Sequence, residues 1–124
     1  MHHVALLSSR YEETREFYTE LMGMDIEWEP DADNVYLSSG KDNLAIHRRS
    51  SNESSVDSRL DHIGFVVSSE SQVDAWYQFL KDHHVSIAAE PKTHRDGSRS
   101  CYVLDPDETQ VQIIHHPPLT ESLR

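Results

Sequence analysis

Histidine is the residue type whose number and placement in this chain point most directly to chemistry. The sequence holds nine histidines among 124 residues. Three of them, His3, His47 and His62, fall within apolar segments of alternating character, as does Gln112. Imidazole is the commonest side-chain ligand for first-row metals, and an amide oxygen can complete such a set. This pattern predicts a site for a divalent metal ion (Fe, Zn, Ni, Co or Mn). The alternative is a wet cavity in which these polar groups bond to each other and to water.

Other side chains are candidates for binding or proton transfer. No catalytic residue is assigned from the sequence, but His47 and Tyr102 are candidates, and His47 can act either as a metal ligand or as an acid–base group. Arg95 and Arg99 flank the turn Asp96-Gly97 and can clamp an oxyanion, while Tyr36 and Tyr102 offer stacking surface or a phenolic proton. The alternatives are a solvated turn with surface ion pairs, and tyrosines that only pack.

An internal repeat explains how these residues come together. When the chain is shifted by 59 residues, segment 3–7 (HVALL) falls on 62–66 (HIGFV) and Phe17-Tyr18 falls on Trp76-Tyr77. Each strand of the pair alternates, with histidine and a small residue on one face and apolar residues on the other. The same parity in segments 43–49 and 109–116 places His47 and Gln112 on the polar face. All four candidate ligands can therefore point into one groove.

Each repeat continues with an amphipathic helix and three strands. Val73, Trp76, Tyr77 and Leu80 have helical spacing, and Ser69 with Gln72, like Ser9 with Glu12, has the spacing of a capping box. The helices end near Gly23 and His83. We expect further strands at Asp25–Glu29, Asn34–Ser38, Asn43–Arg49, Val85–Ala89, Arg99–Leu104 and Thr109–His116. Turns are expected at 30–33 and 40–42.

These elements predict an α+β fold made of two tandem βαβββ modules. The modules would form an eight-stranded half-open barrel with one helix per module. The expected boundaries are 1–49 for the first module, 50–59 for a Ser-rich linker, 60–118 for the second module and 119–124 for a tail. Together they would make one compact domain.

The composition of the chain indicates which classes of binding partner and which cellular location to expect. The chain has 22 acidic and 11 basic residues and a net charge of −11, so we expect no binding to nucleic acid or to anionic membranes. A single cysteine, Cys101, excludes an internal disulfide and favours a cytoplasmic location. The N-terminal residues lack the pattern of a signal peptide, and no apolar run is long enough to span a bilayer.

Two longer motifs carry a resemblance to a known family. Segment 17–24 (FYTELMGM) and segment 102–113 (YVLDPDETQVQI) are similar to the helix end and the final hairpin of the vicinal oxygen chelate superfamily. This superfamily includes glyoxalases, bleomycin-resistance proteins and extradiol dioxygenases. The resemblance implies metal ligands on the first and last strand of each module, at His3, His47, His62 and Gln112. Two positions depart from the family pattern, since Gln112 stands in place of glutamate and Glu108 in place of glycine.

The resemblance leads to three functional hypotheses. The first is a metal-dependent lyase, isomerase or dioxygenase acting on a small oxygenated substrate that chelates the ion. The second is a metal-free protein that sequesters a small molecule, as bleomycin-resistance proteins do. The third is a fold with a decayed site, which Gln112 favours. The resemblance also implies a homodimer.

Overall fold

The computed structural model describes residues 1–50 and 60–117. Within them the βαβββ order occurs twice, so the predicted α+β class with two tandem modules and one helix per module is confirmed. The chain divides into two compact units, Met1–Asp57 and Ser58–Arg124. Of the predicted linker only Ser50 belongs to the described residues, and the predicted tail lies outside them.

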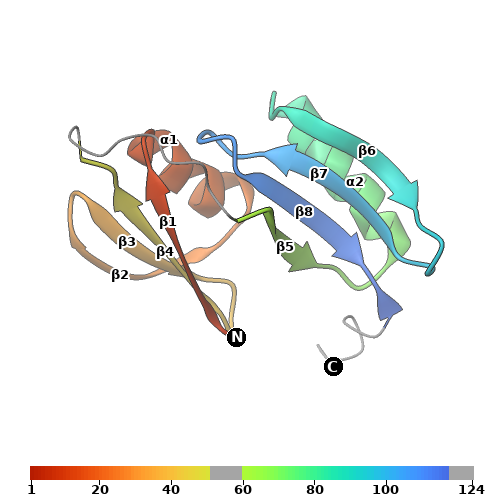
Figure 1. The fold of residues 1–124 in the computed structure, drawn as a ribbon, viewed down its shortest axis with the longest axis horizontal. Helices are drawn as coiled ribbons and strands as arrows, with labels where there is room; N and C mark the ends of the chain where they lie inside the picture. The colour runs from red at the N-terminus through yellow and green to blue at the C-terminus, as the bar shows by residue number, and fades with distance from the viewer. Residues whose placement is uncertain (51–59, 118–124) are drawn as a thin grey trace. The chain divides into compact units, whose positions relative to one another are not determined.

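The first unit holds one four-stranded sheet (Figure 1). Its elements are β1 (His3–Ser8), α1 (Tyr11–Glu16), the π-helical turn η1 (Phe17–Leu21), β2 (Asp25–Asp31), β3 (Asn34–Ser38) and β4 (Asn43–Arg48). The strand order is β1-β4-β3-β2. The first and last strands of the unit are therefore neighbours, and they pair in parallel, whereas the other pairs are antiparallel.

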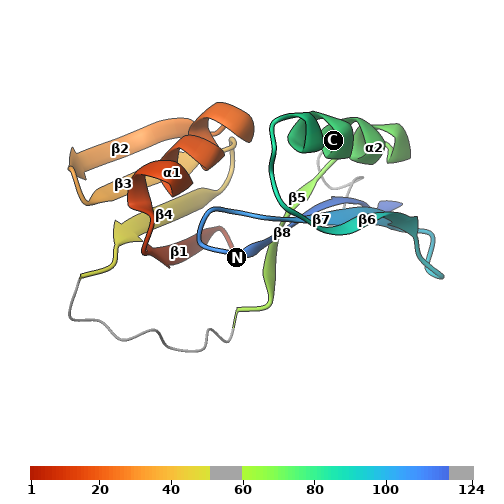
Figure 2. The same ribbon diagram turned by 90° about the horizontal axis from the view of Figure 1, so that it is seen from above.

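The second unit repeats this topology. Its elements are β5 (His62–Val66), α2 (Glu70–Asp82), β6 (Ile87–Thr93), β7 (Arg99–Leu104) and β8 (Gln110–His115). The order is β5-β8-β7-β6, with β5 and β8 parallel. In both units the helix lies against one face of its own sheet (Figure 2).

Each helix covers an apolar sheet face that follows from strand alternation. In the first unit Tyr18 and Ile46 are fully buried, and in the second unit Leu80 and Val111 are. Each buried aliphatic side chain of this size stabilises the fold by about 1.5–3 kcal/mol. The predicted helix faces are thus confirmed, and each unit has a core of its own.

The start of the first helix differs from the prediction. The N-cap is Arg10, which makes no side-chain capping bond, so the predicted capping box at Ser9 is wrong. Instead the backbone N–H of Arg10 donates to Ser8 Oγ at 3.2 Å. At the second helix the prediction holds, because Ser69 is the N-cap and its hydroxyl accepts from the N–H of Gln72.

Both outer strands carry a proline at an irregularity. Pro30 lies in β2 where the pairing with β3 shifts between Trp28 and Asp31, and Pro91 lies in β6 where the pairing with β7 shifts between Ala89 and Lys92. Proline has no N–H to donate, so edge strands and bulges are the places where a sheet accepts it. The predicted strands stopped before these prolines, at Glu29 and Ala89. In the structure β2 continues to Asp31 and β6 to Thr93.

The turn before β8 keeps its shape despite the glutamate in it. The buried carboxylate of Asp105 accepts the N–H groups of Asp107 and Thr109, each at 2.9 Å. Glu108 between them has φ +68°, a left-handed conformation that suits glycine. The hydrogen bonds to Asp105 therefore hold Glu108 in a strained backbone conformation.

Replacing Glu108 by glycine should raise the free energy of unfolding by about 0.5–1 kcal/mol, because the left-handed conformation costs an L-residue more than glycine loses in chain entropy. Urea unfolding measures the change. The control is Lys92→Gly in the edge strand β6, which should lower stability by a similar amount. A Glu108→Gly variant less stable than the parent would show that the turn carries no strain.

Candidate site on the open sheet faces

The face of each sheet opposite to its helix, which we call the open face, carries the histidines and Gln112 that were predicted as ligands. Along β1 the side chains of Leu6 and Ser8 are buried, whereas His3 and Ala5 are exposed. Along β8, Val111 and Ile113 are buried and Gln112 is half-buried. The alternation predicted for these strands is therefore observed, and it sends the histidines and Gln112 away from the helices.

Three polar residues form a cluster on the open face of the second unit. Gln112 Nε2 donates to the hydroxyl of Tyr102 at 3.0 Å, and the ring of Tyr102 meets that of His62 edge to face, with centroids 5.3 Å apart. Gln112 lies level with Gly64 on β5, and its Oε1 would be 3.4 Å from a Cβ built there. Gly64 thus leaves the space that the Gln112 amide occupies.

The imidazole of His62 is oriented by its neighbour in the chain. Its Nδ1 lies 2.6 Å from Asp61 Oδ2, and a carboxylate in this position accepts the Nδ1 proton. The other ring nitrogen, Nε2, then carries a lone pair. A carboxylate or carbonyl partner on the far nitrogen is the usual way in which proteins orient a histidine that binds a metal.

His3 is oriented in the same way in the first unit. Its Nδ1 lies 2.7 Å from the side-chain oxygen of Asn43, the residue level with it on β4. This oxygen accepts the Nδ1 proton, so the Nε2 of His3 is also left as an acceptor. His3 and His62 are equivalent in the repeat, and both have an oxygen partner that selects the same tautomer.

The strand register places His47 at a different level from the other candidate ligand of the first unit, His3. Ala5 is level with Ala45, and Gly64, its equivalent in the second unit, is level with Gln112. The counterpart of Gln112 is therefore the buried Ala45, not His47. His47 is level with Leu7, four residues beyond His3, which is about 13 Å along the strands. The register thus sets the Cα of His47 well apart from that of His3, and its candidate role as a metal ligand stays a prediction.

The other candidate donors are His3, His62 and Gln112. Residues 1–50 and 60–117 contain no group of three or more His, Cys, Asp or Glu side chains placed to hold a metal ion. Within the second unit, two atoms that can bind a metal ion lie on the adjacent strands β5 and β8. They are His62 Nε2 and Gln112 Oε1. Imidazole nitrogen and amide oxygen are both ligand types that first-row divalent ions accept. The donor types therefore fit a divalent ion.

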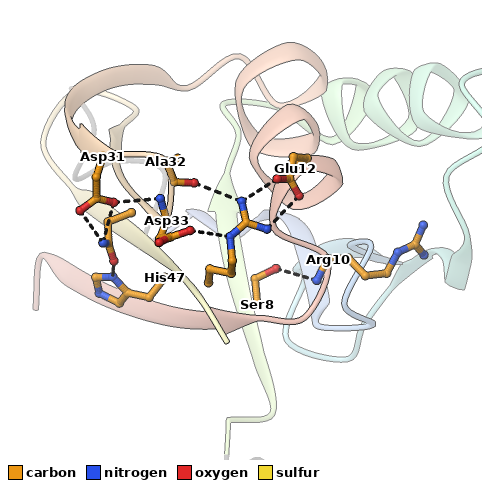
Figure 3. Close-up of polar contacts among 9 residues, drawn as sticks. Ser8, Arg10, Glu12, Asp31, Ala32, Asp33 and His47 are labelled. Atoms are coloured by element: carbon orange, nitrogen blue, oxygen red, sulfur yellow. Dashed lines mark hydrogen bonds and ion pairs between the residues drawn. The ribbon is translucent and has the colours of Figure 1, made fainter. Parts of the chain in front are cut away.

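His47 belongs instead to a second cluster, on the open face of the first unit (Figure 3). Its Nδ1 lies 2.6 Å from Asn34 Oδ1, and Asn34 Nδ2 donates to both oxygens of Asp31, at 2.8 and 3.1 Å. The Asp31 carboxylate also accepts the N–H of Asp33, and these bonds hold its pKa below the usual value. Tyr36 packs edge to face on the His47 ring.

The predicted oxyanion clamp is only partly free to bind. Arg99 Nη2 lies 2.7 Å from Asp74 Oδ1, so its guanidinium ties β7 to α2. Arg95 lies exposed in the turn between β6 and β7, which Gly97 closes with φ +87°. The ion pair with Asp74 supports the alternative of a turn flanked by surface ion pairs for Arg99.

The sequence-based prediction missed the residues that orient the imidazoles. These are Asn43 for His3, Asp61 for His62 and Asn34 for His47. Asp61 could have been found, because a carboxylate next to a candidate ligand in the chain is a visible signal. The two asparagines become partners only through the strand pairing, which the sequence does not show.

Comparison with known proteins identifies the family. The model of the Glyoxalase/Bleomycin resistance protein/Dioxygenase superfamily matches residues 1–113. The chain therefore belongs to this superfamily, as the resemblance of its motifs had suggested. A search of curated protein sequences finds no significant match.

Solved structures show the same fold. Lactoylglutathione lyase from Agrobacterium tumefaciens is 16% identical with a TM-score of 0.76, over 93% of this chain and 92% of that one. A putative glyoxalase from Bacillus halodurans is 20% identical with a TM-score of 0.77, over 94% and 95%. A glyoxalase/bleomycin resistance protein/dioxygenase from Alicyclobacillus acidocaldarius is 19% identical with a TM-score of 0.70, over 93% and 89%. In the described part of the chain no helix is long and apolar enough to cross a membrane.

The thiol of Cys101 gives a pH-dependent prediction. Cys101 is fully buried, and this burial raises its pKa from 9.0 to about 11. Between these values the unfolded chain loses the thiol proton and the folded chain keeps it, so stability falls as the pH rises. The contribution lost by pH 11 is about 2 kcal/mol.

The measurement is urea unfolding between pH 8 and pH 11 on the parent and on Cys101→Ala. The variant should be less stable at every pH because of its cavity, but its stability should decline less steeply above pH 9. Parallel curves would mean that the thiol ionises equally in both states.

Proposed function

We propose that this protein binds a divalent metal ion and acts as a lyase, isomerase or dioxygenase on a small oxygenated molecule, with His3 in the first unit and His62 and Gln112 in the second unit as its candidate ligands. The observation that supports this most is the matched pair of oriented histidines. His3 and His62 occupy equivalent positions in the two units, and each has its Nδ1 on a side-chain oxygen, at 2.7 and 2.6 Å. In both histidines this arrangement leaves the lone pair of Nε2 available to bind a metal ion.

The neutral donors favour a particular ligand chemistry. Two imidazoles and an amide leave the full charge of a divalent ion, so the site would prefer a substrate with anionic oxygens, such as an enolate or a catecholate. When bound, the ion would supply Lewis-acid stabilisation of negative charge on those oxygens. The same neutrality makes the ion easier to lose than one held by carboxylates.

Tyr102 would act beside this ion. Gln112 Nε2 donates to the phenolic oxygen, so the hydroxyl hydrogen of Tyr102 is not used in that bond. It is therefore available to a substrate oxygen. A glutamate at position 112 would accept this hydrogen instead, so the amide keeps Tyr102 a donor towards the substrate. Tyr102 remains our candidate for proton transfer.

A second candidate function is the metal-free sequestration of a small molecule. It is supported by the lack, within residues 1–50 and 60–117, of a cluster of three strong metal-binding side chains. The exposed indole of Trp28, stacked on Tyr36, also suits an aromatic ligand.

Metal content separates these two functions. Elemental mass spectrometry on tag-free protein, reconstituted with Fe(II), Zn(II), Ni(II), Co(II) or Mn(II), should give about one ion per chain. His62→Ala should abolish binding, and Asp61→Ala should weaken it about 10-fold or more, because the imidazole loses the oxygen that orients it. His83→Ala is the control, since that histidine contacts the Phe79 carbonyl at the end of α2. No stoichiometric metal under any condition would favour sequestration.

Replacing Gln112 by glutamate should tighten metal binding at least 10-fold, because a carboxylate adds a negative charge to the ligand set. Calorimetric titration of the apoprotein with Zn(II) measures the affinity. Gln78→Glu is the matched control for net charge, since Gln78 lies on α2, where its side chain contacts Asp82. Equal gains in both variants would indicate a general charge effect and count against Gln112 as a ligand.

We also propose a homodimer in the cytoplasm with a small molecule as its partner. The dimer follows from the family resemblance. Light scattering at micromolar protein should give twice the chain mass of 14.3 kDa. A monomer across this range would contradict the proposal.

A further inference from the structure

The helix of the second unit, α2, carries a series of aromatic rings on its outer face. The rings of Trp76 and Phe79 meet edge to face with centroids 5.7 Å apart, and the ring of His83 lies 4.2 Å from that of Phe79. Phe79 is 39% exposed, although it is a large apolar side chain. Ala75, Trp76 and Phe79 line a hollow of about 220 Å³, which we call the α2 hollow.

The α2 hollow lies on the side of the helix that is turned away from β6. The hydroxyl of Tyr77 donates to Glu90 on β6 at 3.4 Å, so this part of the helix surface faces that strand. Phe79 follows two residues later, which places it about 160° around the helix from Tyr77. Because β6 and β5 are the two edges of the sheet (Figure 1), the hollow faces the β5 side.

The chain leaves the second unit close to the start of α2, next to β5. The N–H of Val67 donates to the carbonyl of Ile114 at 2.8 Å, and Nδ1 of His115 lies 3.3 Å from the carbonyl oxygen of Val67. Val67 precedes the first residue of α2, Glu70, by only three positions. The residues after β8 therefore begin beside the first turn of α2, on the side that carries the hollow.

The segment 118–124, which lies outside the described residues, is long enough to reach the hollow. Trp76 and Phe79 lie about 9 and 14 Å along the axis from Glu70, at 1.5 Å per residue. Seven residues span about 10 Å as a helix and about 24 Å when extended. A segment that turns back along α2 thus reaches Trp76 in either conformation.

The composition of this segment suits an apolar surface. Its sequence is PLTESLR, and its large apolar side chains are Leu119 and Leu123. Residues four positions apart lie on the same side of a helix, and Pro118 is well tolerated in a first helical turn. A helix of this length is not stable alone in water, so it needs a surface against which the two leucines can pack.

The internal repeat provides a comparison within the same chain. A shift of 59 residues places Ala75 and Phe79 on Glu16 and Glu20, which are both exposed. The first unit is followed by segment 50–58 (SSNESSVDS), which contains neither leucine nor an aromatic residue. The apolar outer helix face and the leucine pair therefore occur together in the second unit, and neither occurs in the first.

We propose that segment 118–124 folds back onto α2 as a C-terminal strap and places Leu119 and Leu123 in the α2 hollow. The strap covers Phe79 and so keeps an exposed aromatic surface from contact with other molecules. The hollow lies on the helix side of the sheet, whereas Gln112 lies on the open face. The strap is therefore separate from the function proposed above.

The first test measures the stability of the full chain by urea unfolding. Leu119→Ser combined with Leu123→Ser should lower the folding equilibrium constant about 10-fold or more, because two leucines lose their burial. Thr120→Ala combined with Ser122→Ala is the matched control and should change it by no more than about 2-fold.

A double-mutant cycle locates the contact. Phe79→Glu gives α2 the residue that the first unit has at this position, and because Phe79 is partly exposed the protein should still fold. In this background the two leucine substitutions should change the folding constant by no more than about 2-fold, since the apolar surface that they contact has gone.

A nitroxide label on a Ser122→Cys variant tests the position of the strap directly. Cys101 is buried and its pKa is raised, so the label reacts with the new thiol. A Trp28→Phe background leaves Trp76 as the single indole N–H signal in 15N NMR spectra. This signal should broaden, recover when the nitroxide is reduced, and stay sharp when both leucines are replaced by serine.

Four outcomes would overturn the proposal. The first two are an unchanged folding constant in the leucine variant and an equally large loss in the Phe79→Glu background. The third is an unbroadened Trp76 signal in the nitroxide-labelled protein. The fourth is full broadening in a mixture of 15N-labelled protein and separately nitroxide-labelled protein, which would mean that the segment docks on a second copy. All these measurements are made without metal, so the strap and the proposed function can fail independently.

Discussion

The parallel pairing between the first and last strands of each unit is the constraint on which the open faces depend. Strand alternation decides only whether a side chain points to the helix or away from it. The register decides which of the outward side chains stand level with one another. Here it sets Ala5 beside Ala45 and Gly64 beside Gln112, and these two rows decide which side chains of a unit stand close together on its open face.

The two units use the same framework for different chemistry. The equivalent rows contain tyrosines, Tyr36 in one unit and Tyr102 in the other. In the second unit Gly64 leaves room for the side-chain amide of Gln112, which donates to the hydroxyl of Tyr102. In the first unit two alanines leave Tyr36 without such a partner in its row, and it packs between Trp28 and His47. Equivalent rows thus hold a polar pair in the second unit and an aromatic stack in the first.

Much of the fold could be predicted because periodicity and turn residues act locally. The shift that aligns His3 with His62 identifies the repeat, and the spacing of Val73 and Leu80 identifies the helical face. The sequence could not predict which residue of the first strand stands level with His47. Moving two residues along a strand returns to the same face, so Ala45 and His47 are indistinguishable by parity, and only the partner strand separates them. The π-helical turn at Phe17–Leu21 was missed for a related reason, since one extra residue per turn leaves a similar apolar pattern.

The prolines in the outer strands have a consequence for self-association. An edge strand with free N–H and C=O groups invites a strand from another molecule, and this is a common route to aggregation. Pro30 and Pro91 interrupt that hydrogen-bonding edge in β2 and β6, and Glu27, Glu29 and Asp31 add negative charge along β2. The strands β1 and β5 contain no proline. Further strand addition to either sheet is therefore directed to the edge formed by its parallel first strand.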